Sequence, residues 1–309
     1  MKLGFMCGLT HNGLCTIDQY IAEVQQAEAM GFEQAWMGQV FSTDAIGMMT
    51  LLGRETKTIH LGTAVTPIYP RHPTALALQA LTASAASDGR FDLGIGVSHQ
   101  LVMEDMFGLS YERPAARTEE YLRVLMPLLR GEQCDFDGND YRVHAKMTVP
   151  GAHAVPVLVA ALGERMLRIA GTLADGTSTW MTGPNTLAHH IIPTITQAAR
   201  DAGRPAPRIV ASFPIVLTDD TSTVREVLTK KIGVYGYLPS YKAMLEREGT
   251  DNPVDIAMVG NEAALLERLD HLRDIGVTDF NAFCIGTDNT ATARTMAFLA
   301  SIKAQLAGH

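Results

Sequence analysis

Short apolar runs that alternate with segments of helical periodicity are the feature that most constrains the fold of this chain. Buried strands that alternate with amphipathic helices are typical of βα units. Eight such runs within 309 residues favour a closed parallel (β/α)8 TIM barrel over an open doubly wound sheet, which usually has fewer strands. The eight expected strands cover residues 3–6, 34–38, 59–65, 91–97, 155–160, 177–181, 209–217 and 280–285.

Local signals predict where several helices begin and end. Thr16 and Gln19 can form a capping box, and Gly31 suits the C-terminal end of the helix that follows. Near the end of the chain, Asn261 can cap a helix that stops at Gly276. These signals support the alternation that the apolar runs indicate.

Two stretches depart from the alternation. Residues 131–150 are polar, with Asp-Gly-Asn-Asp at 137–140, and predict a hairpin before the fifth strand. Residues 233–254, rich in Tyr, Gly and Pro, predict a long loop after the seventh strand, of the kind that often covers an active site. We therefore expect one domain over residues 1–309, with insertion segments after strands four and seven.

Composition excludes several classes of function. A formal charge of −8 and a pI near 5.7 argue against a nucleic-acid surface, which needs clustered Lys and Arg. No apolar stretch is long enough to span a membrane, and no signal peptide precedes the first apolar run. The four scattered cysteines form no CxxC pair, so we expect reduced thiols, no metal site and a cytoplasmic location.

The carboxyl ends of the strands, where barrel enzymes place their chemistry, are poor in charge and rich in small residues. No strand-end Lys for a Schiff base and no His-x-His for a metal occurs there. Such ends suit a large planar organic cofactor held by main-chain hydrogen bonds. Taken singly, each Gly or Ala is better explained as a packing or turn residue, and only the set of them indicates a cofactor. Gly94 and Gly96 fail as a dinucleotide fingerprint because His99 stands at the third glycine position.

Residues 163–168 open a helix directly after a buried strand. Backbone N–H groups and the positive end of the helix dipole could bind a phosphate there, helped by Arg165 and Arg168. The other interpretation is an ordinary surface helix with solvated arginines. From the residues alone both remain open.

One long stretch resembles a known family. Residues 60–99, with Arg71-His72-Pro73 and the pattern Gly-Arg-Phe-x-Leu-Gly-x-Gly at 89–96, closely resemble the luciferase-like flavin and deazaflavin oxidoreductases. Residues 27–36, 167–177 and 258–280 are similar to other segments of that family. The resemblance implies a barrel with a flavin-type ring at the carboxyl ends of its strands.

The resemblance also implies the residues that hold the cofactor. The Ala64–Val65 peptide should form an irregular bulge, often a nonproline cis bond, that presses against the ring. Residues 160–163 match the phosphate loop of the deazaflavin branch. The cofactor-binding residues implied in this way are Thr63, Ala64, Val65, Thr66, Gly96, Val97, Ser98, Ala160, Ala161, Leu162, Gly163, Arg165, Thr179 and Thr182.

The chain departs from the family pattern at the proposed catalytic positions. Gln39 and Val40 stand where deazaflavin members often carry Asp-His, and His99 replaces a frequent Glu. Lysines that some members carry near Gly183 are missing. We expect His99 to exchange a proton with the substrate and Gln39 to position a water, although His99 could instead only bind the cofactor or cap a turn.

The function implied is hydride transfer between the deazaflavin coenzyme F420 and a small organic substrate. An FMN-dependent monooxygenase and a noncatalytic flavin-binding barrel are the alternatives. The family resemblance further implies a homodimer. No nucleic-acid or membrane partner is expected.

Overall fold

The structure, a computed structural model, describes residues 1–9 and 14–306. The chain forms two compact units, and each unit is built from segments that are not contiguous in the sequence. The first unit comprises Met1–Trp36, Ser178–Thr194 and Arg208–His309, and the second comprises Met37–Thr177 and Ile195–Pro207. Within the described residues, no helix has both the length and the apolar character needed to cross a bilayer.

Parallel strands make up the sheet. In the first unit β1 (Lys2–Met6) pairs with β12 (Asp279–Cys284), which pairs with β10 (Arg208–Leu217). In the second unit β5 (Phe91–Gly96) lies between β3 (His60–Thr63) and β8 (Val157–Val159). The remaining parallel strands are β2 (Gln34–Met37), β4 (Thr66–Pro67), β9 (Gly176–Trp180) and β11 (Met258–Gly260).

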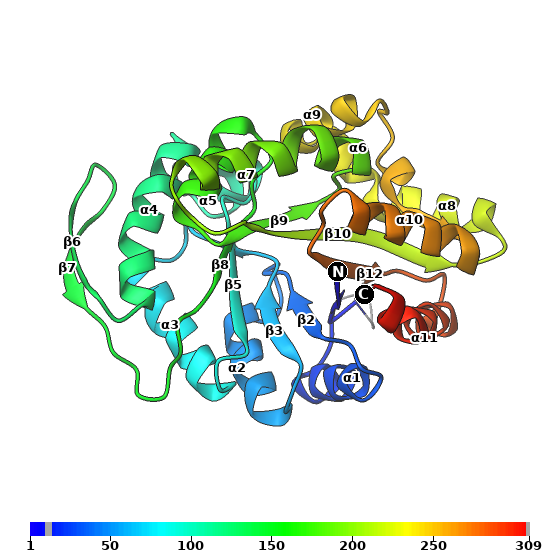
Figure 1. Cartoon of the computed structure of the whole chain (residues 1–309), viewed down its shortest axis with the longest axis horizontal. Helices are drawn as coiled ribbons and strands as arrows, with labels where there is room; N and C mark the ends of the chain where they lie inside the picture. The colour runs from blue at the N-terminus through cyan, green and yellow to red at the C-terminus, as the bar shows by residue number, and fades with distance from the viewer. Residues whose placement is uncertain (10–13, 307–309) are drawn as a thin grey trace. The chain divides into compact units, whose positions relative to one another are not determined.

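The strand order confirms the barrel that the apolar runs predict. The order is β11-β10-β12-β1-β2-β3-β5-β8-β9, and β10 also pairs with β9, which closes the circuit. Figure 1 shows β3, β5 and β8 of the second unit side by side. Each of the eight apolar runs overlaps one of the barrel strands, with bounds that differ by a few residues at most. Short β4 continues the third run beyond a bulge, and β11 joins β10 outside the circuit.

Helices follow the strands as the periodicity predicts. In the first unit they are α1 (Ile17–Ala29), α6 (Pro184–Thr186), α8 (Thr221–Ile232), α9 (Pro239–Glu248), α10 (Glu262–Asp274) and α11 (Asn289–Leu306). In the second unit they are α2 (Ala45–Glu55), α3 (Pro73–Ala86), α4 (Pro114–Leu129) and α5 (Glu164–Leu173). Helix α7 (Ile192–Asp201) contributes residues to both units. The described residues also include the short non-α helices η2 (Val102–Met106), η3 (Leu187–Ile191), η4 (Gly233–Tyr237) and η5 (Pro253–Ile256).

The predicted helix ends are confirmed. Thr16 accepts from the Gln19 backbone N–H at 3.3 Å while the Gln19 side chain accepts from the Thr16 N–H at 2.8 Å, so both donors are satisfied. Asn261 accepts from the Ala264 N–H at 3.0 Å at the start of α10. Gly31 follows α1 with φ +90°, a conformation that a side chain disfavours.

The two insertion segments are also present. Residues 131–150 contain an antiparallel hairpin of β6 (Gln133–Asp137) and β7 (Arg142–Lys146), as predicted. Residues 233–254 contain η4 and α9 and reach into η5, so the segment is largely helical and not an irregular loop. Pro239 at the first turn of α9 and Gly249, with φ +88°, delimit that helix.

Candidate active site

The irregular peptide predicted between Ala64 and Val65 is present as a cis peptide bond. It lies between β3 and β4 in the second unit. The Ala64 N–H donates to the Met37 carbonyl at 2.8 Å, and the Gln39 N–H donates to the Val65 carbonyl at 3.3 Å. The turn is therefore tied on both sides to the residues at the end of β2.

Two glycines of β5 allow the backbone to pass directly beside this turn. A Cβ on Gly94 would stand 1.9 Å from the Thr63 carbonyl oxygen, and one on Gly96 would stand 2.7 Å from a Val65 methyl and 3.1 Å from Ala160 Cβ. The Thr63 hydroxyl accepts from the Gly94 N–H at 2.9 Å and donates to the Gly94 carbonyl at 2.7 Å. The predicted residues Thr63, Val65, Gly96 and Ala160 therefore lie together in a tightly packed group.

The backbone after β5 positions His99. Ser98 has φ +60°, and its carbonyl accepts from the Tyr111 hydroxyl at 3.1 Å. The His99 carbonyl accepts from the N–H groups of Val102 and Met103, both at 3.0 Å, at the start of η2. The His99 side chain is half-buried, and burial lowers its pKa from the usual 6.5. The neutral imidazole therefore predominates at neutral pH.

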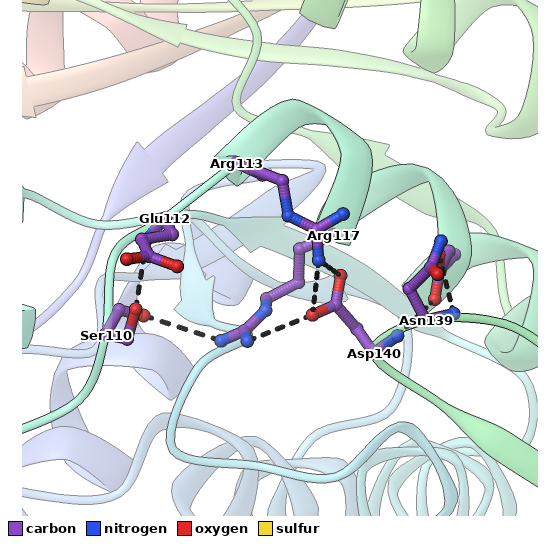
Figure 2. Close-up of polar contacts among 7 residues, drawn as sticks. Ser110, Glu112, Arg113, Arg117, Asn139 and Asp140 are labelled. Carbon is purple, nitrogen blue, oxygen red and sulfur yellow. Dashed lines mark hydrogen bonds and ion pairs between the residues drawn. The ribbon is translucent and has the colours of Figure 1, made fainter.

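A series of side-chain contacts leads from the β6–β7 hairpin to the loop that follows β5. Tyr111 stacks on Tyr69, with ring centroids 5.2 Å apart, and the Arg117 guanidinium lies 4.9 Å from the Tyr69 ring centroid. Arg117 and Arg113 both donate to the Asp140 carboxylate at 3.2 Å (Figure 2). The contacts connect the β6–β7 hairpin, through α4, to the carbonyl next to His99.

Gln39 lies in the same unit, where its side-chain amide is bonded to its own loop. Its Oε1 accepts from the Ala45 N–H at 2.8 Å at the start of α2, and its Nε2 donates to the Val40 carbonyl at 3.3 Å. Arg71 reaches Gln39 Oε1 at 3.5 Å and forms an ion pair with Asp44. In this arrangement Gln39 fixes the loop after β2.

The predicted phosphate loop leads into α5. Ala160 donates its N–H to the Ile95 carbonyl at 2.8 Å, Ala161 is buried and Leu162 is half-buried. Gly163 is the N-cap of α5, makes no side-chain cap and has open space where a Cβ would stand. A helix start of this kind leaves backbone N–H groups directed outward.

The two arginines near the start of α5 differ in whether they form an ion pair. Arg165 is exposed. Arg168 is bonded to Glu164 one turn earlier at 2.7 Å. Of the two, Arg165 is the one whose guanidinium has no ion-pair partner in the part of the chain that the structure describes.

Thr179 and Thr182 belong to the first unit, whereas the other predicted site residues belong to the second. The Thr179 hydroxyl donates to the Val210 carbonyl at 3.4 Å, and that of Thr182 donates to the Trp180 carbonyl at 3.2 Å. In the second unit, the Thr66 hydroxyl is buried and has no hydrogen-bond partner within residues 1–9 and 14–306. Thr66 is thus a polar group that the protein itself leaves unmatched.

Sequence analysis missed two groups of residues beside the strand ends. Tyr69, Tyr111 and Arg117 meet only through tertiary packing, so no local pattern marks them. Glu23 on α1 accepts from the Gly8 N–H at 2.7 Å, just beyond β1. Burial raises the pKa of Glu23 to about 7, although the Gly8 N–H lowers it. An acid within the apolar stripe of α1 was the available signal for Glu23.

A family model described as luciferase-like monooxygenase matches residues 1–304. The chain belongs to the luciferase-like monooxygenase family. A curated relative, 5,10-methylenetetrahydromethanopterin reductase of Methanolobus tindarius, is 28% identical over 240 residues, which cover 77% of this chain and 73% of the relative.

Solved structures of luciferase-like fold superpose over nearly the whole chain. Coenzyme F420-dependent tetrahydromethanopterin reductase of Methanopyrus kandleri gives a TM-score of 0.76 at 21% identity, covering 97% of this chain and 96% of that one. The oxygenating constituent of 3,6-diketocamphane monooxygenase from Pseudomonas putida, in complex with FMN, gives 0.76 at 15% identity, covering 97% of each. At these identities the superpositions show the shared fold.

Proposed function

We propose that this luciferase-like protein is an oxidoreductase that transfers a hydride between coenzyme F420 and a small organic substrate. The observation that carries the proposal is the start of α5 at Gly163, which has no side-chain cap, in the same unit as the Ala64–Val65 turn that packs directly against Gly96. A phosphorylated planar cofactor needs both features.

The residues fit such a cofactor. Val65 and Thr66, with Gly96, Val97 and Ser98, would hold the ring, since the missing side chain of Gly96 lets β5 pack directly against Val65 and brings these residues together. The unmatched Thr66 hydroxyl supplies a further polar group beside them. At the other end, the backbone of residues 160–163 and the Arg165 guanidinium would hold the phosphate. Thr179 and Thr182 stay predictions as cofactor ligands.

The protein's own contribution to the chemistry is the handling of a proton. When bound, the deazaflavin supplies the hydride donor or acceptor. The neutral imidazole of His99 accepts the proton that a substrate releases on oxidation, and the imidazolium returns it in the reverse reaction. Gln39 holds the loop after β2 in place and, as predicted from the sequence, would orient a water.

The preference for F420 over FMN follows from the relatives. The curated relative at 28% identity is a reductase, and the solved tetrahydromethanopterin reductase is F420-dependent. The FMN-bound monooxygenase, at 15% identity, favours the second candidate function, an FMN-dependent monooxygenase.

Parallel titrations of the apoprotein with F420 and with FMN decide between the two candidates. We expect F420 to bind at least about tenfold more tightly, a difference of ~1.4 kcal/mol. Tighter binding of FMN would favour the monooxygenase. Binding of F420 without turnover of any offered substrate would favour the noncatalytic barrel.

The variant Gly163→Asp tests the phosphate position. Its carboxylate would cap α5 and occupy the position proposed for the phosphate, so F420 affinity should fall about tenfold while stability holds or rises by a few tenths of a kcal/mol. Gly233→Asp is the matched control. Gly233 also has open space where a Cβ would stand, and the substitution adds the same charge in the first unit. Unchanged F420 affinity in Gly163→Asp would place the phosphate elsewhere.

Three further expectations from the sequence stay predictions. They are a single domain over residues 1–309, a homodimer and a cytoplasmic location. Sedimentation velocity measures the second directly.

A further inference from the structure

Five large apolar side chains are exposed on two loops of the second unit. They follow β2 and β5, and each is between 46% and 66% exposed. We call this set the apolar rim: Val40, Phe41, Leu101, Met106 and Phe107. Scattered single apolar residues are normal on a protein surface, whereas a group confined to two loops requires an explanation.

The two loops of the apolar rim are in contact. The rings of Phe41 and Phe107 meet edge to face, with centroids 6.1 Å apart and planes at 90°. Met103, fully buried, anchors η2 between Leu101 and Met106. The segment η2 is a π-helix, a rare element that is often found at functional sites. The exposed residues in it and at its ends therefore belong to a regular element and not to a frayed loop.

Two polar side chains beside the rim, those of Gln39 and Glu104, are already engaged in hydrogen bonds. Gln39 bonds to the backbone of Val40 and Ala45. Glu104 accepts from the Gln100 side chain at 2.8 Å and from the Tyr111 N–H at 3.1 Å. The rim therefore offers apolar contacts, with the exposed carboxylate of Asp105 in η2 beside them.

The position of the rim indicates what covers it. Val40 and Phe41 follow Gln39 directly, and Leu101 lies two residues after His99, so the rim is next in sequence to both proposed catalytic residues. We propose that the apolar rim binds the apolar portion of an uncharged substrate whose reacting group meets His99. This inference rests on the proposed function and adds to it the chemical class of the substrate.

The test measures binding of a homologous series to the F420 complex. Straight-chain secondary alcohols from butanol to decanol serve as probes, and calorimetry gives their dissociation constants. Burial of one methylene is expected to tighten binding about fourfold. Wild-type protein should show such increments along the series.

Two double variants locate the effect. Phe41→Ser with Phe107→Ser should reduce the increment per methylene to less than about twofold, since the added carbons would remain in water. Leu51→Ser with Leu78→Ser is the matched control, because these leucines are 44% and 45% exposed on α2 and α3 of the same unit. The control should keep the wild-type increments.

The outcomes separate this inference from the proposed function. Loss of the increments in the rim variant only, with F420 affinity unchanged, supports the inference. Equal increments in both variants, or none in the wild type, overturn it. If the rim variant instead converts a dimer to a monomer with alcohol binding unchanged, the rim is an interface with a second copy, and the inference is wrong. A failure of F420 to bind would refute the proposed function itself, and the F420 titration detects it separately.

Discussion

At the scale of the residue, the protonation state of His99 sets how the rates of substrate oxidation and of the reverse reduction depend on pH in the proposed reaction. Because burial lowers its pKa below 6.5, the imidazole stays neutral as the pH falls from about 8 to 6.5. Substrate oxidation, which needs the neutral base, should be level over that range and fall only at more acidic pH. The reverse reduction should rise as the pH falls. Initial rates in both directions measure this, and a shared profile would contradict it.

Removal of the imidazole gives a complementary prediction. His99→Ala should lower turnover about 100-fold while leaving F420 affinity nearly intact, because the side chain acts on the substrate proton. His144→Ala, on the exposed hairpin, should leave both unchanged. Should F420 affinity collapse while turnover of the bound complex survives, His99 is a cofactor ligand.

Tyr111 positions His99 without reaching the reacting atoms. Tyr111→Phe removes the hydrogen bond to the Ser98 carbonyl, worth about 1 kcal/mol, and keeps the stacking on Tyr69. We expect kcat to fall roughly fivefold, with KM and F420 affinity little changed. Tyr237→Phe, at a position 87% exposed, is the control. A role in stability alone would lower the melting temperature and leave kcat unaltered.

At the scale of the element, the close approach of β3 and β5 determines which residue position 94 accepts. A Cβ there would meet a backbone oxygen, which no rotamer change can move. Gly94→Ala should reduce the free energy of unfolding by about 3 kcal/mol. Gly233→Ala, with open space around the new methyl, should change it by less than about 1 kcal/mol. Urea denaturation compares the two, and equal stabilities would show that β3 and β5 move apart at little cost.

The elements were largely predictable because their signals are local. Apolar runs, the Thr16–Gln19 capping box and the Asp-Gly-Asn-Asp turn each act within a few residues, and the strands, helix ends and hairpin that they predict are confirmed. The packing of Tyr69 on Tyr111 and the ion pair of Arg117 with Asp140 join distant positions, so a pattern in one segment could not reveal them. The cis peptide was predicted only through the family resemblance.

At the scale of the whole molecule, Glu23 makes global stability depend on pH. Burial raises its pKa in the folded protein from 4.5 to about 7, against the opposing Gly8 N–H. Between those two values the unfolded carboxyl has lost its proton while the folded one keeps it, so the free energy of unfolding falls as the pH rises. The total loss is about 3 kcal/mol, complete above pH 7.

Glu23→Gln should remove this pH dependence. Gln stays neutral and can still accept from the Gly8 N–H, so the variant should exceed the wild type in stability above pH 7 and match it near pH 4.5. Glu246→Gln, exposed on α9, is the control and should follow the wild type. Urea midpoints across this range measure the difference, and parallel curves for Glu23→Gln and wild type would contradict the assignment.

The interleaving of the two units has a consequence for synthesis on the ribosome. The whole second unit is translated by residue 207, and its strands β3, β5 and β8 pair with one another in the order of the chain. In the first unit Lys2 of β1 pairs with Asp279 of β12, so this edge of β1 waits for nearly the entire chain. At ~5–20 residues per second, the wait lasts for roughly 15–60 s. We therefore expect the second unit to fold first, while the unpaired edge of β1 is exposed to aggregation until β12 has been made.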